Sequence, residues 1–561
     1  MKRRGWLTIL LLLAIALFAY RNGAKQFFLQ DEWQAMGLVL YYKKIGSLAA
    51  LFLPYKGLLA HFNPLTTALF LLENHFFHFW YGGYAWISVF THLVNTALLY
   101  VFVLRWGRKQ HLAFSVAALF AVYSISHQAV TWISGGNGLM QATTLFLLSL
   151  HGLHLYVTTR KRHFLLFTTA MFFLSLFFKE DVVFLFLGIP SFYFIMEHRP
   201  GKKSYVVLLA MMATFVLYVS IRLLLVAKGL YAYEETVDVS TQHIFVYPFR
   251  AMIMPIRMLT QSLIPELVIL TASRWFTTTA YPQFMVDGQP NPFISETIVA
   301  DFVSYMGTIA MLGITFVIYR ILRELKETGL SKLVVFSIIL ITESALSYIF
   351  VPGRAGFFSI LPSRYLYIAS IGASIFVSVA LYAFWTQVAR GQRKLLIGGY
   401  MVSMGIVALL HYGNLQHTIQ GFAAVGTLRK SFLTAIRSNH ETLPKRVVVY
   451  TKSDTVHYGS PNGEYTLPVQ SGFGQMLLVW YDATEHFPAC LFEKLYLYER
   501  LSQEYRECGA RGFGYFREKD KLLEAVREFG LPRESIIGFS YSGKRQEFED
   551  ITGEVQKELF P

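Results

Sequence analysis

The chain has 561 residues, of which 54% are hydrophobic and only 15% are charged. This balance is too apolar for a water-soluble globular protein of this length, and it excludes disordered and fibrous chains. The formal net charge of +15 does not indicate nucleic-acid binding, because Lys and Arg are spread over short loops and no recognition motif accompanies them. The composition therefore predicts an integral membrane protein.

Eleven apolar runs predict a polytopic α-helical membrane protein with about eleven transmembrane helices. Several are close to the roughly 20 residues that a bilayer requires, and the shorter ones need tilt or polar ends. The runs are residues 6–20, 86–104, 111–123, 139–157, 163–178, 182–196, 204–226, 299–319, 333–351, 364–386 and 395–411. Segment 244–272 is also apolar, but it contains Arg250, Arg257 and three prolines. It therefore predicts an interfacial or re-entrant element and not a span.

Basic residues between alternate runs predict the orientation. Alternation places five basic loops on one face, which the positive-inside rule makes cytoplasmic. Because Lys2, Arg3 and Arg4 precede the first run, the N-terminus joins that face, although a cleavable signal peptide at 1–20 is an open alternative. The predicted location is a cell membrane, the inner or plasma membrane in a bacterium, with the C-terminal part extracytoplasmic. The basic loops lie at residues 105–109, 160–162, 199–203, 320–332 and 390–394.

Acidic residues in the long outer loop 21–85 are the first candidates for chemistry. Asp31 and Glu32 follow the first predicted span closely. At the membrane surface a low dielectric can raise a carboxyl pKa and keep a base reactive. A solvated pair or a helix N-terminal charge is the simpler alternative.

Two further charged sites lie on the same predicted side, where a second long loop covers 227–298. Lys179-Glu180-Asp181 interrupts an otherwise apolar stretch, where charges are costly and usually functional. A turn that neutralises its own charges is the alternative. Arg364 opens a late span, where its planar guanidinium suits a lipid phosphate, and a snorkelling anchor beside Tyr365 is the alternative.

Histidines and a glycine-containing loop complete the candidates. His127 and Asn137 lie in a short outer loop whose glycines allow close backbone approach. The spacing of the outer-side histidines matches no metal signature, so they are predicted to be satisfied or interfacial side chains and not metal ligands. These histidines are His61, His75, His78, His92 and His127.

Taken together, these residues resemble the GT-C superfamily of membrane glycosyltransferases. Asp31-Glu32 looks like the acidic pair in the first outer loop of protein O-mannosyltransferases. The order of the later motifs is similar to the membrane part of the transmembrane and tetratricopeptide-repeat O-mannosyltransferases. The corresponding segments are residues 61–66, 92–95, 127–130, 179–180 and 365–372. Gly136 to Leu139 stand where that family has an Arg-Asp pair, and no tetratricopeptide period follows residue 412.

The resemblance implies a GT-C-like bundle and an inverting glycosyltransferase of the hexosyl or mannosyl class. A sugar would pass from a polyprenyl-phosphate-linked donor to a hydroxyl acceptor on a protein, lipid or glycan, as in protein glycosylation. Asp31 is the predicted base, and Glu32 would orient the acceptor or assist Asp31. Lys179 and Arg364 would neutralise the leaving phosphate. Further predicted donor or substrate contacts are His61, His127, Asn137, Glu180, Asp181 and Tyr365.

No cofactor is implied as required, and a divalent metal stays an open alternative. The expected partners are the lipid-linked sugar donor, membrane lipid and a hydroxyl acceptor that the sequence does not identify, with no nucleic acid. A transporter or flippase is the main alternative from another class, since it also needs many helices with charges. A glycan polymerase or ligase, and a membrane receptor without catalytic activity, are also compatible with this topology.

A soluble domain at residues 430–561 is predicted to follow the membrane domain at 1–425. The composition becomes charged and mixed there, which favours a small α/β or α+β unit. The expected strands are 446–450 and 476–481, and the expected helices are 490–507 and 519–529. Cys490 and Cys508, the two cysteines of the chain, predict a disulfide in an oxidising compartment, with two reduced thiols as the alternative.

Overall fold

The structure, a computed structural model, describes residues 3–29, 31–37, 62–197, 202–227, 246–286, 288–291, 293–350, 359–389, 391–454, 473–482, 491 and 503–561. The chain forms two compact units. Unit 1 comprises Met1–Arg21, Ala60–Thr66 and Ala85–Thr418, and unit 2 comprises Asn22–Leu59, Thr67–Tyr84 and Ile419–Pro561. The predicted boundary between residues 425 and 430 falls within one continuous helix, Arg393–Asn439.

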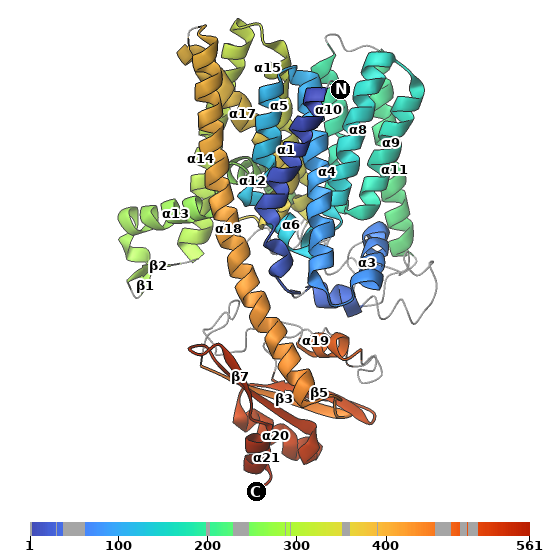
Figure 1. The fold of residues 1–561 in the computed structure, drawn as a ribbon, viewed down its shortest axis with the longest axis vertical. Coiled ribbons are helices and arrows are strands. Elements are labelled where there is room, and N and C mark those ends of the chain that lie inside the picture. The colour runs from blue at the N-terminus through green and yellow to red at the C-terminus, as the bar shows by residue number, and fades with distance from the viewer. Residues whose placement is uncertain are drawn as a thin grey trace. The chain divides into compact units, whose positions relative to one another are not determined.

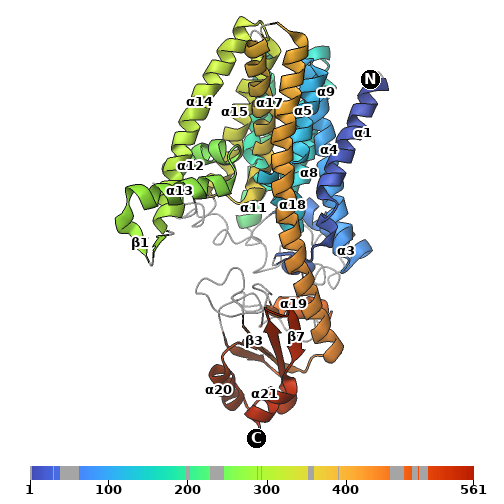
Figure 2. The ribbon, with the colours of Figure 1, turned by 60° about the vertical axis from the view of Figure 1, so that its left-hand side comes forward.

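All eleven apolar runs are mainly helical over their described residues. Their helices lie side by side as a bundle in unit 1 (Figures 1 and 2). They are α1 (Arg3–Tyr20), α4 (Tyr81–Gly107), α5 (Gln110–Ala121), α8 (Leu139–Thr159), α9 (Arg162–Phe178), α10 (Gly188–Met196), α11 (Lys202–Ala227), α14 (Ala300–Glu324), α15 (Thr328–Leu346), α17 (Tyr367–Ala389) and α18 (Arg393–Asn439). The prediction of a polytopic helical membrane protein is confirmed.

Among the described residues, seven helices are long and apolar enough to cross a membrane, namely α1, α4, α11, α14, α15, α17 and α18. Helices α5 and α9 are apolar but shorter, and α10 has nine residues. Large apolar side chains point outward from the long helices, with Leu209 66%, Phe316 62% and Leu409 69% exposed. Such a surface is stable against lipid and not against water.

Helices α12 (Val246–Gln261) and α13 (Glu266–Ala280) form a broken pair. Their axes differ by 108°, because the chain turns just before Pro265, the N-cap of α13. Helix α13 runs across the direction of the bundle in Figures 1 and 2. A two-stranded hairpin follows, β1 (Met285–Val286) and β2 (Gln289–Pro290). The pair is either a broken span, which would be the eighth, or a re-entrant element of the kind that the two arginines and three prolines predict.

The basic loops gather at one end of unit 1. Three contacts join the turns α4–α5, α8–α9 and α14–α15 and the end of α10. These are Lys109 with Glu327 at 2.9 Å, Arg160 with Glu197 at 2.5 Å, and Lys332 Nζ with the carbonyl of Met196 at 2.9 Å. The structure thus groups these charges as the alternation of spans requires. That this end is cytoplasmic stays a prediction.

Unit 2 contains a five-stranded mixed sheet in the order β4-β5-β3-β6-β7. The central strand β3 (Arg446–Ser453) pairs in parallel with β5 (Arg511–Phe516) and β6 (Ile536–Ser542). The edge strands β4 (Tyr505–Cys508) and β7 (Glu547–Asp550) are antiparallel to their neighbours. Three helices accompany the sheet, α19 (Phe473–Trp480), α20 (Lys519–Phe529) and α21 (Thr552–Leu559). This arrangement confirms a small domain of mixed α and β structure.

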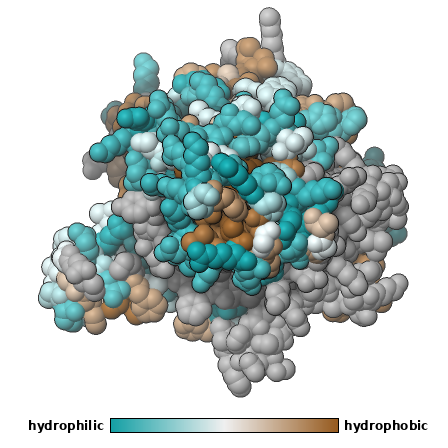
Figure 3. Space-filling model, turned by 90° about the horizontal axis from the view of Figure 1, so that it is seen from below, coloured by the Kyte–Doolittle hydropathy of each residue, from teal (hydrophilic) through white to brown (hydrophobic). Residues whose placement is uncertain are grey.

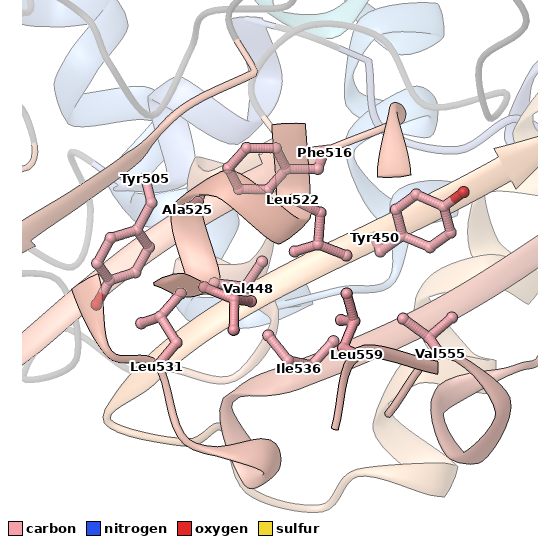
Figure 4. Close-up of a cluster of buried hydrophobic side chains, with 11 residues drawn as sticks. Val448, Tyr450, Tyr505, Phe516, Leu522, Ala525, Leu531, Ile536, Val555 and Leu559 are labelled. Atoms are coloured by element: carbon pink, nitrogen blue, oxygen red, sulfur yellow. The ribbon is translucent and has the colours of Figure 1, made fainter. Parts of the chain in front are cut away.

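The core of this domain explains why it folds. Val448, Phe516 and Ile536 from the three parallel strands meet Leu522 of α20 and Leu559 of α21 (Figure 4). Each of these side chains is at most 7% exposed, and full burial of one such side chain contributes about 1.5–3 kcal/mol. The opposite faces of α20 and α21 are charged. Figure 3 shows hydrophilic residues around a smaller hydrophobic patch on the surface seen from below.

Two local predictions for this domain were wrong. The apolar run 476–481 is mostly helical, as part of α19, because periodicity does not separate a short buried helix from a buried strand. Residues 505–507 belong to β4 and not to a helix, and 492–502 lie outside the described residues. The helix predicted at 519–529 coincides with α20.

Candidate functional site

Asp31 and Glu32 take different positions at the start of a helical segment, residues 31–37 of unit 2. Asp31 is exposed, whereas Glu32 is fully buried. Glu32 Oε2 accepts a hydrogen bond from the backbone N–H of Leu29 at 2.5 Å, three residues earlier, as the glutamate of a capping box does. Of the two carboxylates, Asp31 is therefore the accessible one, and Glu32 stabilises the local fold.

Arg429 of α18 supplies positive charge near the buried Glu32. It is 5% exposed, and the Glu32 carboxylate lies within electrostatic range of its guanidinium. The backbone at Phe27, shortly before Glu32, packs directly against α18. A Cβ added to Gly426 of α18 would be 2.6 Å from the backbone N of Phe27. A buried carboxylate needs such compensation. Arg429 is one residue that sequence reasoning missed.

In unit 1, four charged residues form the structure's second candidate, here called the charged cluster: Lys179, Glu180, Asp181 and Arg364. Lys179 joins α9 to the short helix η4 (Glu180–Phe186), and Arg364 lies in η9 (Ser363–Leu366) just before α17. Helix α9 begins, and α17 ends, at the end of unit 1 that carries the basic loops. The charged cluster therefore lies at the opposite end.

Lys179 and Arg364 lie within electrostatic range of each other. Burial lowers the pKa of Lys179, but the carboxylates of Asp181 and Glu180 raise it more, so the net pKa is above the ordinary value even though Arg364 opposes this. Lys179 is therefore charged at neutral pH. Two like charges held close together favour an anion between or beside them.

Aromatic rings fix the guanidinium of Arg364. Its Cζ lies 4.5 Å from the centre of the Trp132 ring and 4.8 Å from that of Tyr365. Its hydrogen bond to the Tyr365 hydroxyl, at 3.4 Å, is the one that the described part of the chain provides. Stacking of this kind orients the planar fork. Within the described part of the chain, the contacts of this guanidinium are thus mainly with aromatic rings.

Tyr348 connects the two halves of the charged cluster. Its hydroxyl donates to Asp181 Oδ2 at 3.3 Å, and its ring stacks on Tyr365 with centroids 4.3 Å apart. Ser347 Oγ donates to the carbonyl of Asp181 at 2.5 Å. Sequence reasoning missed Tyr348, because a tyrosine inside an apolar run carries no signal of its own.

A third cation, Arg222 of α11, lies near the same carboxylates. Tyr218 lies within electrostatic range of Arg222, Glu180 and Asp181. The Arg222 guanidinium is 6.0 Å from the centre of the Phe62 ring. With Lys179 and Arg364 this gives three cations and two carboxylates among the described residues of the site.

His127 and Asn137 hold their own loop in place. His127 Nδ1 lies 3.2 Å from Thr131 Oγ1, and burial lowers the His127 pKa to about 4. Asn137 is 2% exposed and its Oδ1 accepts a hydrogen bond from Gln141 at 3.1 Å. The predicted close backbone approach at the glycines is seen at Gly136, where an added Cβ would clash with the backbone oxygen of Ala129. Substrate contact by His127 and Asn137 stays a prediction.

Several other predictions are not tested by these contacts. His61 and Cys490 lie outside the described residues, so the Cys490–Cys508 disulfide and a role for His61 stay predictions. In the parts of the chain that the structure describes, no group of three or more His, Cys, Asp and Glu residues could hold a metal. His92 is instead bonded to the Tyr367 hydroxyl at 2.9 Å and to the Ala121 carbonyl. The question of a metal requirement stays open.

No protein-family model matches the sequence, and no curated protein matches it. Among solved structures it is similar to ArnT from Cupriavidus metallidurans bound to undecaprenyl phosphate, with 12% identity over 86% of this chain and 85% of that chain and a TM-score of 0.37. The apo structure of the same ArnT is 13% identical over 96% of this chain and 94% of that chain, with a TM-score of 0.39. The apo oligosaccharyltransferase of Archaeoglobus fulgidus is 11% identical over 80% of this chain and 62% of that chain, with a TM-score of 0.38.

Proposed function

We propose that the protein is a GT-C-type glycosyltransferase that takes its sugar from a polyprenyl-phosphate-linked donor. The observation that carries the proposal is the proximity of Lys179 and Arg364, two half-buried cations from separate elements of a lipid-exposed helical bundle. A phosphate on a membrane lipid has the charge and the geometry that such a pair binds. The donor's hydrocarbon chain would remain in the bilayer.

The same cations would assist the chemical step. When the bond between the anomeric carbon and the phosphate oxygen breaks, negative charge grows on the leaving phosphate. Lys179, Arg364 and Arg222 then interact with the transition state more strongly than with the donor, which is the condition for acceleration. Glu180 and Asp181 keep the cations charged and in place.

Asp31 is the base in this proposal. It would accept the proton of the acceptor hydroxyl while that oxygen attacks the anomeric carbon from the face opposite the phosphate, which inverts the configuration. Glu32 is assigned a positioning role, because it is buried and hydrogen-bonded to the backbone at Leu29. The acceptor and the sugar are left open.

The test is transfer of label from radiolabelled polyprenyl-phosphate sugars to acceptors in membrane extracts. Wild-type protein should transfer label, and Asp31→Asn should lower the rate by about 10²–10⁴-fold, the usual contribution of a general base. Glu296→Gln is the matched control, because this exposed carboxylate pairs with Arg274 in an exposed ion pair of small energetic value. Equal rates for wild type and Asp31→Asn would refute the assignment of Asp31 as the general base. Labelled lipid that crosses the bilayer unchanged would favour the flippase.

A further inference from the structure

Glu343 is a buried carboxyl inside a helix that is long and apolar enough to span the membrane. It is 8% exposed, and its Oε1 accepts a hydrogen bond from Ser191 Oγ of α10 at 3.2 Å. Among the described residues its Oε2 has no hydrogen-bond partner. The backbone of α10 lies directly against this oxygen, because a Cβ on Gly188 would be 2.5 Å from Oε2.

The surroundings of Glu343 do not support a negative charge. The Ser191 hydroxyl is its one polar partner, and no ion pair joins it to the described part of the chain. An ionised carboxylate in such a place is costly unless it is paired, so the group keeps its proton instead. A protonated carboxyl can still accept the hydrogen bond of Ser191 and pack closely against Gly188.

Glu343 lies near the C-terminal end of α15, which continues directly into the short 3-10 helix η8 (Ser347–Phe350). Ser347, one helical turn farther on, and Tyr348 next to it both bind Asp181. Residues four apart on a helix share a face. Helix η8 therefore contacts the start of η4 through Asp181, and the end of α15 contacts the start of α10 through Ser191.

We propose that Glu343 is a positioning residue, an uncharged carboxylic acid that latches α10 to α15 and so keeps Lys179 and Asp181 in register with Arg364. The consequence for donor binding rests on the proposed function. The latch itself does not, because it concerns contacts within unit 1. Glutamine can replace a neutral carboxyl in this role, and alanine cannot.

Infrared spectroscopy of the full-length protein in lipid nanodiscs tests the protonation state. The difference spectrum between wild type and Glu343→Gln at neutral pH should show the C=O stretch of a protonated carboxyl in the wild type. A carboxylate stretch in its place would overturn the proposal.

Substitutions test the latch. Glu343→Gln should keep the affinity for polyprenyl phosphate within about twofold, whereas Glu343→Ala should weaken it by about tenfold, equivalent to about 1.4 kcal/mol, and lower the thermal midpoint. Ser344→Ala is the control, because the bond that the described residues give Ser344 Oγ lies within its own helix, to Ile341 at 2.8 Å. Equal midpoints for Glu343→Ala and wild type would overturn the latch. If the infrared and thermal results are as expected but the wild-type protein transfers no sugar, the proposed role of Glu343 is supported and the proposed function is refuted.

Discussion

Gly138 is the position where one added methyl group should disturb the charged cluster. It precedes α8, and a Cβ there would lie 2.5 Å from both the backbone oxygen of Phe178 and Thr66 Oγ1. These two atoms are themselves joined by a hydrogen bond of 2.5 Å. Phe178 is directly followed by Lys179, so Gly138→Ala should displace the backbone that carries this lysine.

The magnitude follows from the kind of atoms that the methyl group meets. A backbone oxygen and a hydrogen-bonded hydroxyl cannot rotate away as the tip of a long side chain can. Overpacking of this kind usually costs about 1–3 kcal/mol. Gly138→Ala should therefore lower the free energy of unfolding by that amount. If the displacement of Lys179 lowers the binding free energy of polyprenyl phosphate by about 1.4 kcal/mol, the affinity should weaken by about tenfold.

Thermal unfolding in detergent and titration with polyprenyl phosphate measure the two effects. Gly313→Ala is the matched control, since a Cβ at this helical glycine meets no atom within 4 Å. That substitution should stabilise α14 by about 0.5–1 kcal/mol, the usual difference between alanine and glycine in a helix. The reasoning is refuted if Gly138→Ala unfolds at the wild-type midpoint and binds the lipid normally.

Three further outcomes follow from single sites. Arg257→Ala should lower the free energy of unfolding by about 3–5 kcal/mol, because the buried Arg257 binds Asp301 through two hydrogen bonds of 2.7 Å; a loss below about 1 kcal/mol, typical of an exposed pair, contradicts this. Leu522→Ala should cost about 2–5 kcal/mol within the C-terminal domain, measured by hydrogen exchange of β3, and unchanged protection contradicts it. The depressed pKa of His127, about 4, means that the unfolded chain binds its proton first as the pH falls below 6.5. Stability should therefore decline between pH 6.5 and about 4, and His127→Gln should flatten this decline in pH-dependent unfolding.

Most of the bundle was predictable because apolar length is a direct consequence of the bilayer as solvent. Charges between the runs likewise marked the turns, and the broken pair α12–α13 was visible through its prolines. The count of spans was less predictable. Runs such as 182–196 become a short helix, α10, preceded by the separate turn η4. Hydropathy alone does not show where a helix breaks.

The candidate site was predictable only where a residue contrasts with its neighbours. Lys179 and Arg364 stand out in apolar sequence, whereas Tyr348 and Trp132 are aromatic residues among many others. The burial of Glu32 was also hidden, because adjacent residues of a helix point about 100° apart and the sequence does not say which one faces inward. These side chains are assigned by packing, which the linear pattern does not contain.

The affinity of the purified protein for polyprenyl phosphate is the most direct test of the central claim that Lys179 and Arg364 bind a lipid phosphate. Lys179→Ala and Arg364→Ala should each weaken binding by about 10–100-fold, as expected for the loss of one charge-assisted hydrogen bond of about 1.5–3 kcal/mol. Arg274→Ala, which removes an exposed paired arginine, should bind as wild type does. Wild-type affinity in the Lys179→Ala/Arg364→Ala double variant would contradict the account.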